Sequence, residues 1–313
     1  MEINRTEQRN INALSFSIGT FSLWFVYNYF VINPNEDMIS QFFSDYSNNL
    51  LGSPYRYRVL ITDFVLFVAH QFNLNNLIII YRVLMLLIFS FSMFQLLSFI
   101  NKAVSRADLF WCNVYVAQVF LMISFSYHFY QPWSFLDIGL YSFFYSQLLS
   151  FRKKAILIYV FFTLAILNRE TGIFIAALLL IQSFIFKEGR WTKFGNLLLF
   201  MYGVGLLLAL RVWKGYELIS DTSRVLDIFK ENIRPFNLLI YCIILVSSGL
   251  IWLVGVKHFD VRLKAAYVSL ILFLPLYFLF GIWIEIRMLL PFLPILILPV
   301  SEKLVESFSG SKF

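Results

Sequence analysis

Two adjacent carboxylates, Glu36 and Asp37, follow the first apolar stretch of the chain. Neighbouring carboxylates beside a helix end can act as a general base or as ligands of a cation. Arg56 and Arg58 follow in the same segment, and their planar guanidinium groups suit phosphate oxygens. Asp45 lies between the two pairs. The alternative is an ordinary solvated loop, and spacing alone leaves both interpretations open.

Two Arg/Glu pairs occur later, each between apolar stretches. Arg169 and Glu170 lie where a hairpin would turn close to hydrocarbon, a depth at which ionisable residues are costly and therefore functional candidates. An internal ion pair or a hairpin cap would explain the same residues. Glu285 and Arg287 are two positions apart and point to different helix faces, which favours a polar cavity over mutual pairing.

His128 belongs to an aromatic segment, residues 127–133, that ends near Asp137. Aromatic clusters of this kind are typical of the membrane interface. A lone histidine there is more often an interface residue than a ligand. The functional hypothesis is that His128 and Asp137 add to an outer cavity.

The segments that carry these residues alternate with apolar stretches along the whole chain. Hydrophobic residues make up 60% of the sequence and charged residues 14%, with a mean hydropathy of +0.75. A soluble domain is about half apolar and about a quarter charged. The composition therefore predicts a single transmembrane domain over residues 1–313, without a separate soluble module.

The apolar stretches predict an all-α, polytopic transmembrane bundle of about ten spans. Their ranges are 13–32, 77–99, 110–129, 136–151, 155–168, 171–186, 194–210, 236–256, 265–283 and 288–300. A further stretch, 59–72, is short for a crossing and predicts a juxtamembrane helix on the outer surface. It would lie in a first extracytoplasmic loop, residues 33–76, with Asn33-Pro34-Asn35 ending the first span; residues 211–235 would form a second outer loop.

The basic residues set the orientation. If 59–72 does not cross, most of the 25 lysines and arginines fall on the cytoplasmic side, as the positive-inside rule requires, and both termini are cytoplasmic. Basic clusters flank 155–186 at both ends, so this region should be a hairpin that turns at 168–172 on the outer side. The net charge of +7 follows from this bias, and nucleic acid is not an expected partner.

Several motifs are absent from the sequence. It has no glycine-rich phosphate loop, no nucleophile elbow and no metalloprotease histidine pair. Cys112 and Cys242 lie far apart inside apolar stretches, which excludes a zinc spacing and a disulfide framework. ATP-driven transport is therefore disfavoured, and no metal or other cofactor is expected.

Three segments resemble C-type (GT-C) glycosyltransferases: Asp37 followed by Gly52-Ser53-Pro54-Tyr55-Arg56-Tyr57-Arg58, then residues 167–172, then residues 285–291. The resemblance extends in outline over the whole chain. It implies an enzyme that transfers a sugar from a polyprenyl-phosphate donor to an extracytoplasmic glycan, lipid or protein. In that family an acidic residue of the first outer loop is the catalytic base. The best match here is Asp37, with Glu36 as its alternative.

The expected partners are the polyprenyl-phosphate-sugar lipid, the acceptor and membrane lipids. The arginines would stabilise the departing phosphate, and the acidic residues would hold hydroxyl groups. The candidate substrate-binding residues are Asp45, Arg56, Arg58, His128, Arg169, Glu170, Glu285 and Arg287. Richness in Asn, Ile and Phe hints at an AT-rich genome, and we expect a bacterial inner membrane. A transporter or flippase, a polymerase or ligase of lipid-linked saccharides, and a purely structural subunit remain alternatives.

Overall fold

The computed structural model describes residues 5–51, 58–74, 76–104, 113–118, 132–149, 155–215, 263–280 and 290–309, and single positions between 227 and 253. The regular elements in these ranges are all helices, which confirms the predicted all-α class. The apolar stretch 110–129 is described only in part, and 236–256 only at single positions.

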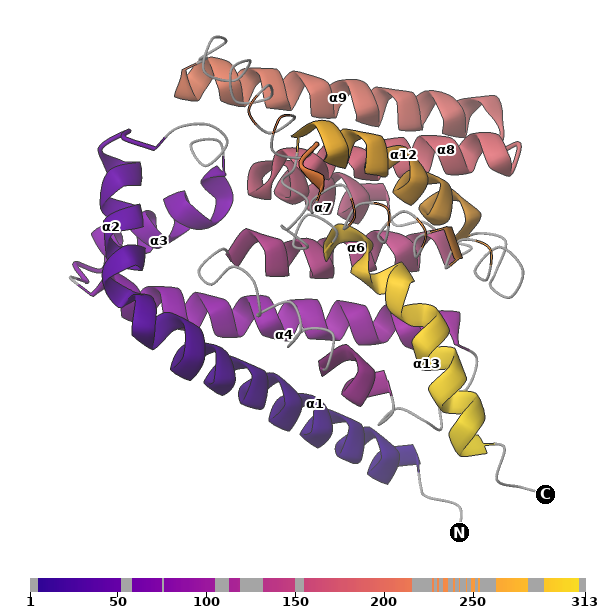
Figure 1. Ribbon diagram of the computed structural model, residues 1–313, viewed down its shortest axis with the longest axis horizontal. Coiled ribbons are helices and arrows are strands. Elements are labelled where there is room, and N and C mark those ends of the chain that lie inside the picture. Colours follow the sequence, from indigo (N-terminus) through magenta and orange to yellow (C-terminus); the bar gives the residue numbers. More distant parts are fainter. Residues whose placement is uncertain are drawn as a thin grey trace.

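The first helix bends where the sequence places Asn33-Pro34-Asn35. Helix α1 (Arg5–Tyr27) continues through a π-helical turn (Asn28–Ile32) and a 3-10 turn (Asn33–Asn35) into α2 (Glu36–Ser47), and the chain changes direction between α1 and α2 (Figure 1). Pro34 has no N–H to donate to the preceding turn, which favours a bend at this point. The helix therefore does not stop here as expected. It is redirected, so Glu36, Asp37 and Asp45 lie on a helix and not in an irregular loop.

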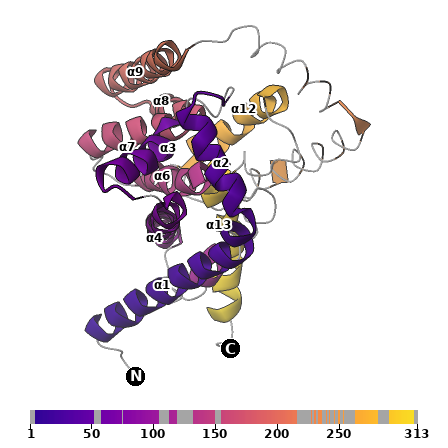
Figure 2. The same ribbon diagram turned by 90° about the vertical axis from the view of Figure 1, so that its left-hand side faces the viewer.

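Helices α2 and α3 (Val59–Gln71) form what we call the cap, at one end of the bundle (Figures 1 and 2). Ile39, Phe43 and Tyr46 recur at helical spacing and are buried, so α2 packs one apolar face on the molecule. Helix α3 occupies the segment predicted as a juxtamembrane helix. Helix α2 is a second cap helix that the sequence pattern does not predict.

Apart from α1, the other helices lie behind the cap, with α4, α6, α7, α8 and α9 side by side (Figure 1). In chain order they are α4 (Leu77–Ala103), α6 (Pro132–Leu149), α7 (Ala155–Asn168), α8 (Ile173–Ile185), α9 (Arg190–Lys214), α12 (Lys264–Phe280) and α13 (Leu293–Ser309). Helix α4 packs along α6, and α8 packs against both α9 and α12. Helices α7 and α8 are joined by a short 3-10 turn (Glu170–Gly172), so the structure contains the predicted turn at 168–172.

Two helices of the described ranges, α4 and α9, are long and apolar enough to cross a membrane. Most of α9 is not covered by the rest of the chain, and Trp191 and Trp213 are exposed near its two ends. Helices α3, α7 and α8 are apolar but shorter. By length and composition, the chain thus has helices suited to a membrane.

The α7–α8 hairpin is much shorter than its neighbour α9. At 1.5 Å per residue, α8 is about 20 Å long and α9 about 37 Å. The two helices are joined by a tight connection, so the 168–172 turn ends well short of the far end of α9. Helix α3 contacts both α4 and α7, and Lys214 at the end of α9 lies 3.6 Å from Asp63 of α3. The cap therefore lies over the short hairpin.

Candidate functional site

A buried polar cluster lies beneath the cap, and Asp137 of α6 is at its centre. The Asp137 carboxylate accepts a hydrogen bond from Asn168 Nδ2 at 2.8 Å and lies 3.5 Å from Arg169 Nη1. Asn168 Nδ2 also donates to the carbonyl of Trp133 at 2.8 Å. These four side chains are almost completely buried. Because a buried carboxylate is stabilised only by such partners, α6 and the end of α7 are held in a defined arrangement.

Arg58 brings a second guanidinium group to this cluster. It precedes the first turn of α3, where its carbonyl accepts a hydrogen bond from Thr62 Oγ1 at 2.7 Å. The guanidinium carbon lies 4.7 Å from the centre of the Trp133 ring, and the side chain is only 5% exposed. Guanidinium groups stack on aromatic rings and still present N–H groups to anions. We call Arg58, Trp133, Asp137, Asn168 and Arg169 the arginine cluster.

The 168–172 turn holds buried oxygens that lack a hydrogen-bond partner in the described part of the chain. They are Asn168 Oδ1, Glu170 Oε1 and Thr171 Oγ1. The backbone of the turn is itself anchored, because Tyr141 donates a hydrogen bond to the Thr171 carbonyl at 2.7 Å. Buried polar atoms are normally paired, so oxygens without partners indicate a place for water or a ligand.

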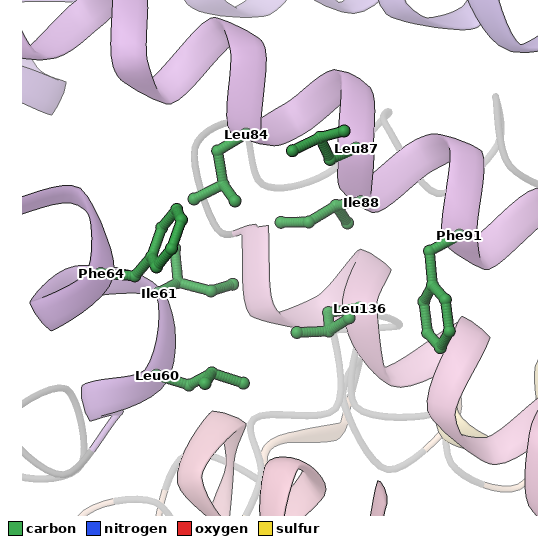
Figure 3. Close-up of a pocket in the computed structure, with 8 residues that line it drawn as sticks. All are labelled: Leu60, Ile61, Phe64, Leu84, Leu87, Ile88, Phe91 and Leu136. Atoms are coloured by element: carbon green, nitrogen blue, oxygen red, sulfur yellow. The ribbon is translucent and has the colours of Figure 1, made fainter. Parts of the chain in front are cut away.

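An apolar groove of about 250 Å³ lies between α3, α4 and α6. Its lining residues are Leu60, Ile61, Phe64, Leu84, Leu87, Ile88, Phe91 and Leu136 (Figure 3). Ile61 is one helical turn beyond Arg58, and Leu136 directly precedes Asp137, so the groove adjoins the arginine cluster. Phe64 and Leu87 are exposed, which leaves the groove open at the surface of the bundle.

The paired carboxylates of α2 lie in different environments. Glu36 is half-buried and forms an ion pair with Arg82 of α4, and Arg82 also donates to Asn33 Oδ1 at 2.8 Å. Asp37 is exposed on the face of α2 that points away from the buried Ile39, and within the described ranges it forms no hydrogen bond or ion pair. Asp37 is therefore the carboxylate of the pair that is open to solvent.

A second set of polar contacts joins the cap to α9. Lys214 Nζ donates to the Tyr46 hydroxyl at 3.0 Å, and this hydroxyl donates to Asp63 Oδ1 at 2.7 Å. Burial raises the pKa of the Tyr46 hydroxyl well above its usual value, so the group stays protonated and keeps its donor role. These contacts link α2, α3 and α9 at one point.

The structure brings only some of the predicted site residues together. Arg58 and Arg169 meet in the arginine cluster, and Glu170 follows directly. Glu36, Asp37 and Asp45 lie on α2 in the cap, and none of them contacts the cluster in the described structure. The candidates Arg56, His128, Glu285 and Arg287 lie outside the described residues.

Asp137 and Trp133 are central to the cluster, whereas the sequence predicts only a secondary role for Asp137, beside His128. The available signal was a carboxylate inside the apolar stretch 136–151. Among the described residues, no group of three or more histidine, cysteine or acidic side chains is placed to hold a metal ion. The two buried guanidinium groups and the adjoining apolar groove are suited to binding an anion that carries an apolar chain.

Comparison of the chain with models of known protein families, with curated proteins and with solved structures gives no match.

Proposed function

We propose that the chain is an integral membrane glycosyltransferase that transfers a sugar from a polyprenyl-phosphate donor to an extracytoplasmic acceptor. The observation that carries the proposal is the apolar groove beside two buried guanidinium groups. A lipid-linked phosphosugar has the matching chemistry, because its tail is apolar and its phosphate is an anion. Guanidinium groups bind phosphate oxygens strongly, above all where water is excluded.

The proposed orientation places the cap on the extracytoplasmic side of a bacterial inner membrane. About ten apolar stretches would then cross the bilayer, with both termini in the cytoplasm. The beginning of α1 and the end of α13 lie toward the same side of the molecule, away from the cap (Figure 1), which supports this topology. In that orientation the arginine cluster is below the membrane surface, and the groove faces lipid.

The proposed chemistry is a direct displacement at the sugar. Asp37 accepts the proton of an acceptor hydroxyl while that oxygen bonds to the anomeric carbon. The bond between the anomeric carbon and the phosphate oxygen breaks, and polyprenyl phosphate leaves with the electron pair. Arg58 and Arg169 stabilise this developing charge. Because Asp37 points away from the cluster here, transfer requires the first turn of α2 to turn inward; Glu36, held by Arg82, is the alternative base.

The test combines gene deletion with two matched variants. Mass spectrometry should show that deletion causes the lipid-linked sugar to accumulate and removes one sugar from a surface glycan. Asp37→Asn should fail to restore transfer, with a loss of about 100-fold or more, because a general base contributes on that scale. Glu36→Gln should retain transfer, because Glu36 is held in an ion pair with Arg82 and does not take the proton.

The result that contradicts the assignment is transfer at the wild-type rate by Asp37→Asn. If Glu36→Gln alone abolishes transfer, the base is Glu36. If deletion leaves every surface glycan intact in composition but traps lipid-linked saccharide on the cytoplasmic side, the protein is a flippase. Longer glycan chains in the wild type, with no new linkage, would instead indicate a polymerase.

A further inference from the structure

The turn between α7 and α8 presents three oxygens whose hydrogen-bonding capacity is not used. Asn168 is 1% exposed, and its Oδ1 has no partner in the part of the chain that the structure describes; the same holds for Glu170 Oε1 and Thr171 Oγ1. Leaving such groups buried without partners costs about 1–3 kcal/mol each. Three of them within four consecutive residues indicate a binding site for a molecule that supplies hydrogen-bond donors.

The orientation of the Asn168 amide is fixed by its neighbours. Its Nδ2 donates to two oxygens, the Trp133 carbonyl and Asp137 Oδ1, each at 2.8 Å. The reverse orientation would bring Oδ1 against both oxygens, so Oδ1 must remain the free acceptor. The Tyr141 hydroxyl holds the Thr171 carbonyl at 2.7 Å and keeps the turn in place. The Asn168 acceptor and the backbone of the turn are therefore held in place.

The chemistry of the turn favours hydroxyl groups over a metal cation. The turn contains a single carboxylate, that of Glu170, and the neighbouring Arg169 guanidinium repels cations. Hydroxyl groups can donate to Asn168 and Glu170 and can exchange donor and acceptor roles with Thr171. Several hydroxyls on one rigid ring are the defining feature of a sugar.

We propose that Asn168, Glu170 and Thr171 bind the hydroxyl groups of the donor sugar and so select which sugar is transferred. This inference rests on the proposed function. It places the phosphate at Arg58 and Arg169 and the sugar ring directly beyond them, at the 168–171 turn. The turn then determines which sugar is accepted. The arginines bind the phosphate, which all such donors share.

The experiment measures binding by the purified full chain in lipid nanodiscs. The probes are bare polyprenyl phosphate and a panel of polyprenyl phosphates that carry glucose, galactose, mannose or arabinose. The wild type should bind at least one sugar-bearing probe about tenfold or more tightly than bare polyprenyl phosphate. Glu170→Gln and Thr171→Val should each reduce that preference by about tenfold and leave the affinity for bare polyprenyl phosphate unchanged. Glu170→Gln replaces a charged acceptor by a weaker neutral one, and Thr171→Val removes the hydroxyl group, so each weakens hydrogen bonding to the sugar alone.

Thr163→Val is the matched control, because Thr163 lies on the exposed side of α7, where its hydroxyl bonds the Tyr159 carbonyl and the Tyr202 hydroxyl. It should bind every probe like the wild type. The inference is overturned if Glu170→Gln and Thr171→Val keep the full preference, or if the wild type binds all sugar-bearing probes no better than the bare lipid. Failure of the wild type to bind any probe, bare lipid included, would overturn the proposed function as well.

Discussion

Asp137 and Arg169 show how a single buried pair can organise a site. Both side chains are almost fully buried, and their closest atoms are 3.5 Å apart. A buried pair adds little net stability over an apolar pair, but removing one partner leaves an uncompensated charge. The pair therefore fixes the arrangement of α6 and α7 more than it strengthens the fold.

This leads to a prediction for Arg169→Gln. The variant should lower the free energy of unfolding by about 3 kcal/mol or more, because the Asp137 carboxylate stays buried without its cation. Thermal unfolding in detergent measures the loss. Adding Asp137→Asn to the same chain should recover part of it, since the remaining charge is then removed. A double variant less stable than Arg169→Gln would mean that Asp137 is held by other groups.

Gly172 gives a second prediction at this scale. A Cβ added there would lie 2.5 Å from the Ala165 carbonyl carbon and 2.6 Å from the Ile166 nitrogen, so the close approach of the turn to α7 requires glycine. Gly172→Ala should destabilise the protein by about 1–3 kcal/mol, as overpacking typically does. The control is Gly205→Ala on the exposed side of α9, where a Cβ would meet nothing within 4 Å. It should be neutral or slightly stabilising in the same melting experiment.

The sequence could indicate the importance of Arg58 and Arg169, because arginines next to apolar stretches are rare and costly. It could not show that they meet. Their proximity at Trp133 and Asp137 depends on α3 folding back over the end of α7, and a single sequence holds no direct signal of that packing. Trp133 was assigned to an interfacial belt for the same reason, although its ring instead lies against Arg58.

Among the elements, the cap was the hardest to predict. Helix α3 was expected from its apolar character, whereas α2 was not, because Asn-Pro-Asn indicates a chain break. The buried Ile39, Phe43 and Tyr46 do show helical spacing, but this signal covers only a few turns. The α7–α8 hairpin was predictable from the basic residues at both ends of 155–186. The positive-inside rule favours placing both ends on the same side of a membrane, which requires an even number of helices between them.

The contact of Lys214 with Tyr46 and Asp63 gives a prediction about the cap as a unit. Lys214→Met should release α2 and α3 from α9, and it should increase amide hydrogen exchange in both cap helices. The cost in free energy should be small, about 1 kcal/mol or less, because Asp63 is partly exposed to solvent. Lys193→Met, near the opposite end of α9, is the control and should leave exchange in the cap unchanged. Unchanged cap exchange in Lys214→Met would show that packing alone holds the cap.

For the whole molecule, the decisive prediction concerns which end faces outward. In a chain with Cys112 and Cys242 replaced, Asn48→Cys in the cap should react with a membrane-impermeant maleimide in intact cells. Gly189→Cys, between α8 and α9, should react only after permeabilisation, because it lies at the end away from the cap. The reverse pattern would place the arginine cluster on the cytoplasmic side and contradict the proposed donor.

In the proposed membrane orientation, helix α9 also has a consequence for the kind of bilayer that suits the protein. Its exposed tryptophans, Trp191 and Trp213, are separated by about 33 Å along the axis at 1.5 Å per residue. Indole rings settle at the level of the lipid headgroups, so this separation measures the hydrophobic thickness that α9 matches. If α9 spans the bilayer as proposed, lipids with shorter acyl chains should favour its tilting, which would strain the contact between Lys214 and Asp63 of the cap. We therefore expect acyl-chain length to affect how firmly α9 and the cap are held together.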